Sequence, residues 1–152
     1  MEPQNPQYAL INFDKTNLLI PQHEVSVIEM IDTVEIQTDT SQSETIGLFH
    51  NNSGSWPIFS ISTDFKKQNK VMDSDRYCVC LQHPEYGQFG LLCTKVSSFQ
   101  VEENYIQTRI TDMMLLPMNP ILKLVYYQNY LYLMSNVDNL YRYLIENQPN
   151  GK

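Results

Sequence analysis

Three cysteines form the group in this sequence with the most obvious capacity for chemistry. Cys78 and Cys80 are separated by one residue, so in a strand their side chains point to the same face. If the chain turns back at residues 84–87, Cys78 pairs roughly with Cys93 and three thiols share that face. A zinc site needs four ligands, or three and a water molecule, and His83 is the nearest candidate for the fourth. Because free cysteine is among the most buried residue types, we predict core thiols, with a metal or redox site as the alternative.

The other residue types do not form the patterns that catalysis requires. The three histidines are scattered, and the sequence has no HxH, HxxxH, HExxH or GxSxG motif. It has five glycines but no GxGxxG or Walker loop, which argues against a phosphate-binding cradle. Glu102 and Glu103 are adjacent, so in a strand they face opposite sides, a poor geometry for an acid–base pair. We therefore predict no enzymatic activity and no cofactor.

The net charge of −7 is concentrated in the first third of the chain. Residues 1–45 contain eight acids and one base, whereas the nine acids and nine bases of the remainder cancel. A nucleic-acid-binding protein needs a basic groove or stripe, so we predict no nucleic-acid partner. The acidic third suits a basic partner surface, or it simply keeps the protein in solution.

The start of the chain lacks the basic and apolar regions of a signal peptide. No apolar run approaches the length that a bilayer-spanning helix needs. Three cysteines are an odd number and do not follow the spacing of a disulfide framework. The sequence therefore predicts a cytoplasmic protein that does not insert into the membrane.

Short strand patterns cover most of the 152 residues. Strands are expected at residues 8–13, 18–20, 34–36, 46–50, 56–61, 76–81, 88–96, 121–127 and 130–134, with one or two more within 97–111. A helical turn is expected after Pro21, and an amphipathic helix over 137–146 with Ser135 or Asn136 as its cap. Residues 1–7 and 147–152 are expected to be flexible, and residues 112–120 to form a connector rich in Met and Leu. Many short, regularly spaced strands favour a β-sandwich or small barrels.

Tyrosines are concentrated near the end of the chain. They are Tyr126, Tyr127, Tyr130, Tyr132, Tyr141 and Tyr143. Aromatic residues of this kind are enriched at protein–protein interfaces. They equally suit the packing of a barrel with hydroxyls that reach water, so the sequence leaves both interpretations open.

The order of these patterns resembles the CheW-like domain of bacterial chemosensory systems over residues 8–146. Four segments carry the resemblance: Leu19-Ile20-Pro21 with Val25 and Ile28, the stretch 47–61 with its turn and Pro57, the Gly-Leu-Leu strand 90–96, and the closing strand and helix over 131–140. In an ungapped match, Asn52 lies where the family carries Arg and Ser53 where it carries Gly. The substitution removes a bidentate cation, which indicates a divergent member, with a pilus-type (twitching-motility) system as one setting.

The resemblance implies a mainly-β fold of two small five-stranded β-barrels packed together, with one short C-terminal helix. Residues 8–146 would form a single domain made of these two barrel subdomains. It also implies a non-catalytic scaffold that couples a histidine kinase of the CheA type to transmembrane methyl-accepting chemoreceptors. The residues expected to bind these partners are His50, Asn52, Ser53, Gly54, Trp56, Val27 and Glu29. The alternative function is a small-ligand or peptide-binding β-barrel of another family.

Overall fold

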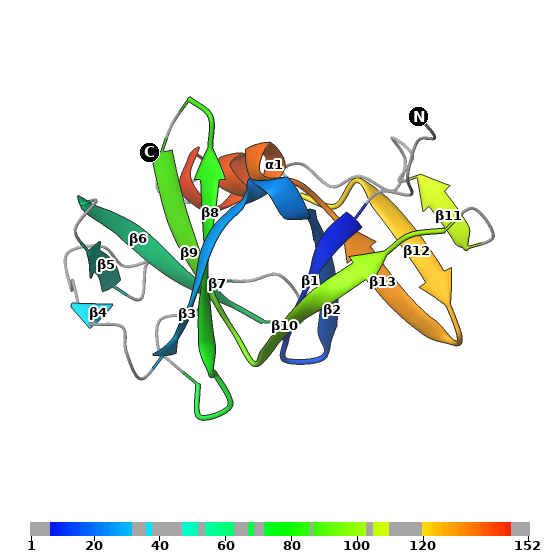
Figure 1. Ribbon diagram of the computed structural model, residues 1–152, viewed down its shortest axis with the longest axis horizontal. Helices are drawn as coiled ribbons and strands as arrows, with labels where there is room; N and C mark the ends of the chain where they lie inside the picture. The colour runs from blue at the N-terminus through cyan, green and yellow to red at the C-terminus, as the bar shows by residue number, and fades with distance from the viewer. Residues whose placement is uncertain are drawn as a thin grey trace.

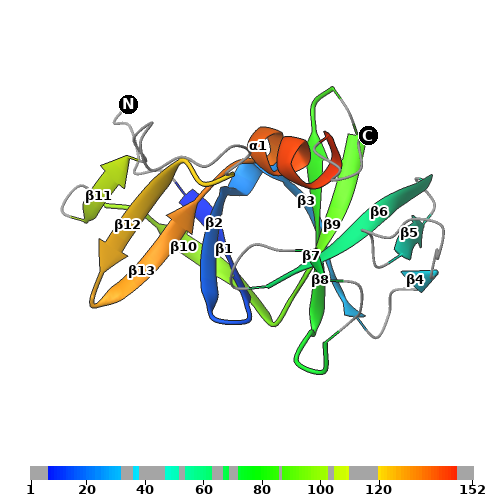
Figure 2. The ribbon, with the colours of Figure 1, turned by 180° about the vertical axis from the view of Figure 1, so that it is seen from behind.

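The structure is a computed structural model that describes residues 7–31, 36–37, 47–51, 54–62, 67–68, 72–85, 87–102, 105–109 and 120–146. Its strands form two sheets, which Figures 1 and 2 show side by side. Sheet A has six strands in the order β10 (Lys95–Gln100), β1 (Gln7–Phe13), β2 (Thr16–Pro21), β13 (Tyr130–Met134), β12 (Lys123–Tyr127) and β11 (Ile106–Arg109). The expectations for residues 1–6, 111–119 and 147–152 fall outside the described residues.

Sheet B has seven strands. The order is β3 (Val25–Met30), β8 (Tyr77–His83), β9 (Gly87–Cys93), β6 (Gly54–Ile61), β5 (Gly47–Asn51) and β4 (Ile36–Gln37), and β7 (Lys67–Gln68) also pairs with β6. A 3-10 turn, η1 (Gln22–Glu24), joins β2 to β3, and the chain closes with α1 (Val137–Tyr141) and the π-type turn η3 (Arg142–Glu146).

The predicted mainly-β class and the short C-terminal helix are confirmed, but the two closed five-stranded barrels are not found. Among the described strands, each sheet is an open path that ends in two edge strands. Sheet A nevertheless curls strongly. The rings of Phe99 on β10 and Tyr132 on β13 lie 4.5 Å apart, although β1 and β2 separate those strands in the hydrogen-bonding order. Side chains rather than a continuous backbone ladder therefore fill the inside of the curl.

Three consecutive pairs of the predicted strands form hairpins, because their turn residues determine the local backbone. β1 pairs with β2 around Asp14, which has φ 54°. β8 pairs with β9, and Gly87 at the end of that turn has φ 107°, which favours glycine. β12 pairs with β13 around Gln128 and Asn129, with φ 51° and 68°. Two successive positive φ values are the signature of a type I′ turn, which matches the twist of the flanking strands.

Two predicted strands have different boundaries in the structure. The expected strand 88–96 ends at Cys93, and β10 begins at Lys95 in the other sheet. At the break, the N–H and hydroxyl of Thr94 both donate to the carbonyl of Asn12, at 2.8 and 3.0 Å. The strand expected near 34–36 overlaps β4 at Ile36, and β3 is a further strand, not predicted, that follows η1 directly. A bulge between Val25 and Val27 disrupts the two-residue alternation that would have revealed it.

One core joins the two sheets. It includes Ile11 and Leu18 from sheet A, Val79 and Phe89 from sheet B, and Leu140 from α1, all fully buried. Each sheet also has a smaller cluster on the inside of its curl, around Leu19 and Val125 in sheet A and around Cys78 and Leu92 in sheet B. The shared core holds the two sheets and the helix together by burial of apolar surface.

The N-terminus of the helix is held by its own cap, by η1 and by β8. The side chain of Asn136 accepts from the N–H of Asn139 at 2.9 Å, which confirms the predicted cap. The carboxylate of Glu24 in η1 accepts from the N–H of Val137 at 2.8 Å. On the other side, Nδ1 of His83 accepts from the N–H of Glu85 and Nε2 lies 2.8 Å from Asp138. Because Nδ1 is an acceptor, the proton of the neutral ring is on Nε2 and is donated to Asp138.

This contact leads to a pH prediction. The hydrogen bond with His83 and the charge of Arg142 lower the pKa of Asp138. A carboxyl whose pKa is lower in the folded chain stabilises the fold above its unfolded pKa of about 3.9, and this contribution is lost as the pH falls through the lowered value. Urea unfolding at pH 3 to 7 should therefore show a smaller loss of stability at acid pH for Asp138→Asn than for the wild type. Parallel curves for the two proteins would contradict the assignment.

Candidate protein-docking groove

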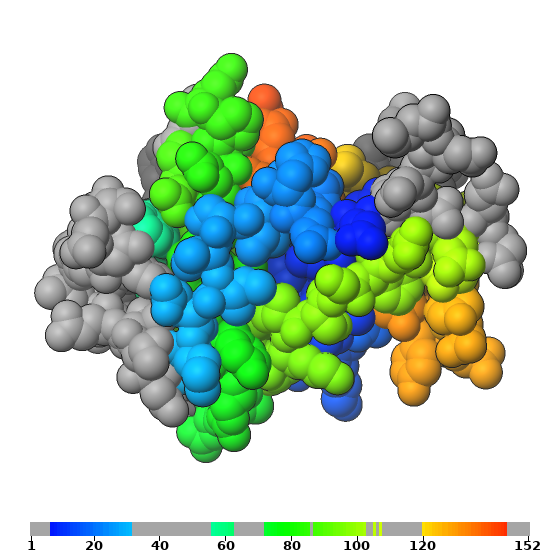
Figure 3. Space-filling model, in the orientation of Figure 1, coloured from blue at the N-terminus to red at the C-terminus, as the bar shows by residue number. Residues whose placement is uncertain are grey.

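A groove lies where the two sheets turn their edges toward each other. Among the described strands, β3 is an edge of sheet B and β10 an edge of sheet A, and Figure 3 shows them on the same face of the molecule. The groove has a volume of about 400 Å³. It is lined by Ala9, Gln22, Val25, Ser26, Val27, Ile28, Val96, Ser97 and Ser98. Its residues come from both sheets and from η1, so the shared core fixes its shape.

The β3 wall of the groove is unusually apolar for an exposed edge. Val27 is 38% exposed and Ile28 is 47% exposed, and Met30 at the end of the strand is 55% exposed. Natural proteins usually protect an edge strand with charged residues, proline or a covering element. Neighbouring apolar side chains on an exposed edge are typical of a surface that another molecule covers.

The β10 wall has a different character. Ser97 and Ser98 are exposed and have short hydroxyl side chains, and Val96 packs against the shared core. Short side chains leave the main-chain N–H and C=O groups of an edge strand accessible. One wall thus offers apolar contact and the other offers hydrogen bonds, a combination that suits a peptide or helix from another protein.

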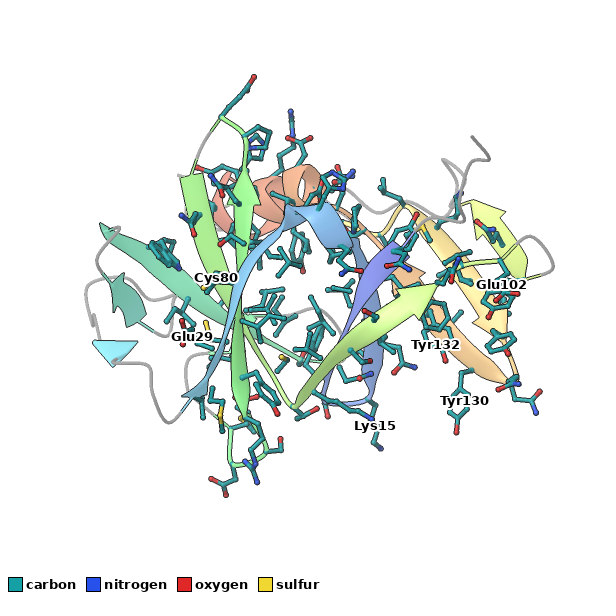
Figure 4. The ribbon with its side chains drawn as sticks, viewed as in Figure 1. Lys15, Glu29, Cys80, Glu102, Tyr130 and Tyr132 are labelled. Carbon is teal, nitrogen blue, oxygen red and sulfur yellow. The ribbon has the colours of Figure 1, made fainter. Side chains whose placement is uncertain are left out.

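The structure separates the predicted partner-binding residues into three places. Val27 lines the groove. Glu29 and Trp56 lie inside the curl of sheet B, where both interact with the thiol of Cys80, and Figure 4 shows Glu29 close to Cys80. Trp56 is buried and packs with Ile58 and Leu92, so it is a core residue of sheet B. That role differs from the expected one of a contact surface.

The predicted turn of the signature lies far from the groove. His50 pairs with Ser55 and Asn51 with Gly54 along the β5–β6 hairpin, at the outer end of sheet B in Figures 1 and 2. Asn52 and Ser53 fall outside the described residues. If this turn binds a partner, it belongs to a second contact surface.

The expected arrangement of the three thiols was wrong by one residue of register. Cys78 pairs with Leu92, and Cys93 pairs with Tyr77. A shift of one residue turns a side chain to the other face of a sheet, so Cys93 lies in the shared core, while Cys78 and Cys80 lie inside the curl of sheet B. All three thiols are buried, as expected for core residues. Within the described ranges, no three His, Cys, Asp or Glu side chains converge as metal ligands.

The electrostatics of the thiols agree with this placement. The pKa of Cys78 is raised by its hydrogen bond with Cys80, by burial and by the nearby charge of Glu29. The hydrogen bond with Cys78 and the neighbouring indole of Trp56 lower the pKa of Cys80. Burial and the charge of Asp75 raise the pKa of Cys93 to about 12. Two of the three thiols, Cys78 and Cys93, therefore stay protonated.

Sequence reasoning identified one wall of the groove only in part and missed the other. Val27 was selected, but Ser97 and Ser98 were not, since nothing in a serine pair predicts an exposed edge. Ile28 and Met30 carried a usable signal, because together with Val27 they place apolar side chains on both faces of one strand, which indicates that both faces meet something apolar.

The fold is CheW-like. The chain matches the crystal structure of the scaffolding protein TtCheW from Thermoanaerobacter tengcongensis with a TM-score of 0.67. The match covers 86% of this chain and 88% of that one, at 10% sequence identity. No protein-family model and no curated protein sequence matches the chain. At this identity the likeness establishes the architecture, so the function rests on the surfaces of this chain.

In the portion of the chain that the structure describes, no helix has the length and apolar character to cross a membrane.

Proposed function

We propose that this chain is a non-catalytic scaffold of a chemosensory pathway, which couples a CheA-type histidine kinase to methyl-accepting chemoreceptors. The observation that carries the proposal is the groove between β3 and β10, with its exposed apolar wall of Val27 and Ile28. The CheW-like architecture, shared with a scaffolding protein, agrees with it. Residues 8–146 would act as one unit on the cytoplasmic side of the membrane, and a pilus-type system is one such setting.

In this proposal the groove holds an apolar segment of one partner. Ile28 and Val27 supply buried contact area, and the main chain of β10 beside Ser97 supplies hydrogen bonds. The β5–β6 turn at His50, Asn52, Ser53 and Gly54 would contact the second partner. Because Asn52 lacks the charge of the family's Arg, this second contact would depend on shape and neutral hydrogen bonds.

The test is a binding measurement with the purified chain, the regulatory domain of the host's CheA-type kinase and the cytoplasmic tip of a host receptor. Ile28→Glu should weaken binding of at least one of them about tenfold or more, because it places a charge in the centre of the apolar contact. Leu122→Glu is the matched control, since Leu122 is 43% exposed and is not one of the groove-lining residues.

Three outcomes would count against the proposal. Equal effects of the two variants would remove the groove as the docking site. Failure of the wild type to bind either partner, with the chain folded, would remove the chemosensory scaffold function. Saturable binding of a small apolar molecule in the groove without either protein would favour a ligand-binding protein of another family, for which a volume of about 400 Å³ is sufficient.

A further inference from the structure

A second surface lies at the open end of the curl of sheet A. Here Phe99 and four tyrosines gather on one face, and we call this group the aromatic end: Phe99, Tyr105, Tyr127, Tyr130 and Tyr132. Phe99 is 6.0 Å from Tyr105 and 4.5 Å from Tyr132, ring centre to ring centre, and Tyr105 stacks on Tyr127 at 4.0 Å. Four of these rings thus form a connected aromatic surface built from β10, β12, β13 and the chain that leads into β11, and Tyr130 lies opposite Tyr127 on the same face of the hairpin.

The register of the β12–β13 hairpin determines which tyrosines belong to this surface. Tyr127 pairs with Tyr130, and Val125 pairs with Tyr132, so these residues share the face that covers the smaller cluster of sheet A. Tyr126 pairs with Leu131 and lies on the opposite face. Tyr130 is 61% exposed and Tyr126 is 44% exposed, so the same hairpin offers two accessible tyrosines with different surroundings.

The aromatic end is rich in electrons and carries a negative charge. The N–H of Tyr105 donates to the carbonyl of Glu102 at 3.1 Å, which holds the exposed Glu102 beside the rings, and Figure 4 shows Glu102, Tyr132 and Tyr130 along this end of the molecule. Burial, the hydrogen bond with Tyr127 and the charge of Glu102 raise the pKa of Tyr105 to about 12. Lys123, farther along β12 on the same face, donates to Gln107 at 3.3 Å.

We infer that the aromatic end docks an arginine side chain from a basic segment of a partner protein. Aromatic faces attract cations through their quadrupole, and Glu102 adds a carboxylate at the rim. A guanidinium is planar, so it can stack on a tyrosine while its fork donates two hydrogen bonds to the carboxylate. An ammonium can do only one of these well, which makes arginine the better fit. The net charge of −7 also favours the approach of a basic segment.

The test uses two fluorescein-labelled peptides that alternate glycine with three arginines or with three lysines. Fluorescence anisotropy should show tighter binding of the arginine peptide to the full chain. Tyr130→Ala should weaken that binding about tenfold, the effect of losing a partly desolvated cation–π contact, and Glu102→Gln should also weaken it. Tyr126→Ala is the matched control, because it removes an exposed tyrosine of the same hairpin from the other face, and it should change affinity less than about twofold.

Several results would overturn the inference. They are equal binding of the two peptides, equal loss in Tyr130→Ala and Tyr126→Ala, or no binding of the arginine peptide. Circular dichroism of each variant separates loss of contact from loss of fold. Ile28→Glu should leave arginine-peptide binding unchanged, so the inference about the aromatic end and the proposed function of the groove are tested independently. Binding that stays the same in all variants would indicate only a general attraction of the acidic chain for cations.

Discussion

Replacing Phe89 with alanine is expected to lower the free energy of unfolding by about 3–5 kcal/mol. Phe89 on β9 is fully buried. Its ring meets Phe59 at 6.3 Å and Tyr141 of α1 at 6.1 Å, both edge to face. The substitution removes these contacts and leaves a cavity at the point where sheet B meets the helix, and the rigid strands around it can collapse only partly.

Urea unfolding followed by circular dichroism measures this loss. Phe89→Leu is the appropriate comparison, because it keeps most of the apolar volume and should cost less than about 1.5 kcal/mol. Tyr126→Ala, on the exposed part of the β12–β13 hairpin, should change stability by about 0.5 kcal/mol or less. A loss below about 1 kcal/mol for Phe89→Ala would mean that the helix and sheet B are not packed through this ring.

The elements that could be predicted from the sequence are those whose local chemistry determines the backbone. Gln128 and Asn129 tolerate the positive φ values of a tight turn, and the apolar runs on either side made the β12–β13 hairpin visible. The cap at Asn136 was visible for a similar reason, since short polar side chains satisfy the free N–H groups of a helix start.

The elements that could not be predicted depend on contacts between distant residues. The residues from Gln88 to Val96 form a continuous strand pattern, yet the chain leaves sheet B after Cys93. The break depends on the carbonyl of Asn12, which accepts two hydrogen bonds from Thr94 and lies 82 residues away. No local pattern records that partner. For the same reason, the expectation of two closed barrels relied on strand spacing and on the resemblance, and the long-range ring contacts across the curl of sheet A had no sequence signal.

The same distinction between local patterns and long-range contacts applies to the candidate site. The sequence selected Trp56 and Glu29 as contact residues because of their position in a familiar pattern. The curl of sheet B instead brings Trp56 and Glu29 to the thiol of Cys80. The order of the strands in a sheet decides which strands are exposed edges. That order depends on contacts between residues that are far apart in the sequence. The groove therefore became visible only when β3 and β10 were known to be edges.

Gly90 on β9 provides the second stability prediction, because it lies between β6 and β8 with little room for a side chain. A Cβ atom at this position would be 2.8 Å from Sγ of Cys78 and 3.5 Å from the side chain of Ile58. Cys78 is fully buried beside Trp56, Ile58 and Leu92, so its sulfur has little room to move. Gly90→Ala should therefore lower the free energy of unfolding by about 1–3 kcal/mol through overpacking.

A double-mutant cycle isolates this contact. When Cys78→Ala removes the sulfur, the methyl group at position 90 can occupy the released space. The double variant should thus lose less stability than the sum of the two single losses, by at least about 0.5 kcal/mol. Cys93→Ala with Gly90→Ala is the matched control, because Cys93 is equally buried but lies in the shared core on the other face of the sheet, and its effects should add. Additive losses in both pairs would show that Gly90 is not needed to make room for the thiol of Cys78, and would place the cause of any destabilisation in the pairing of β9 with β6.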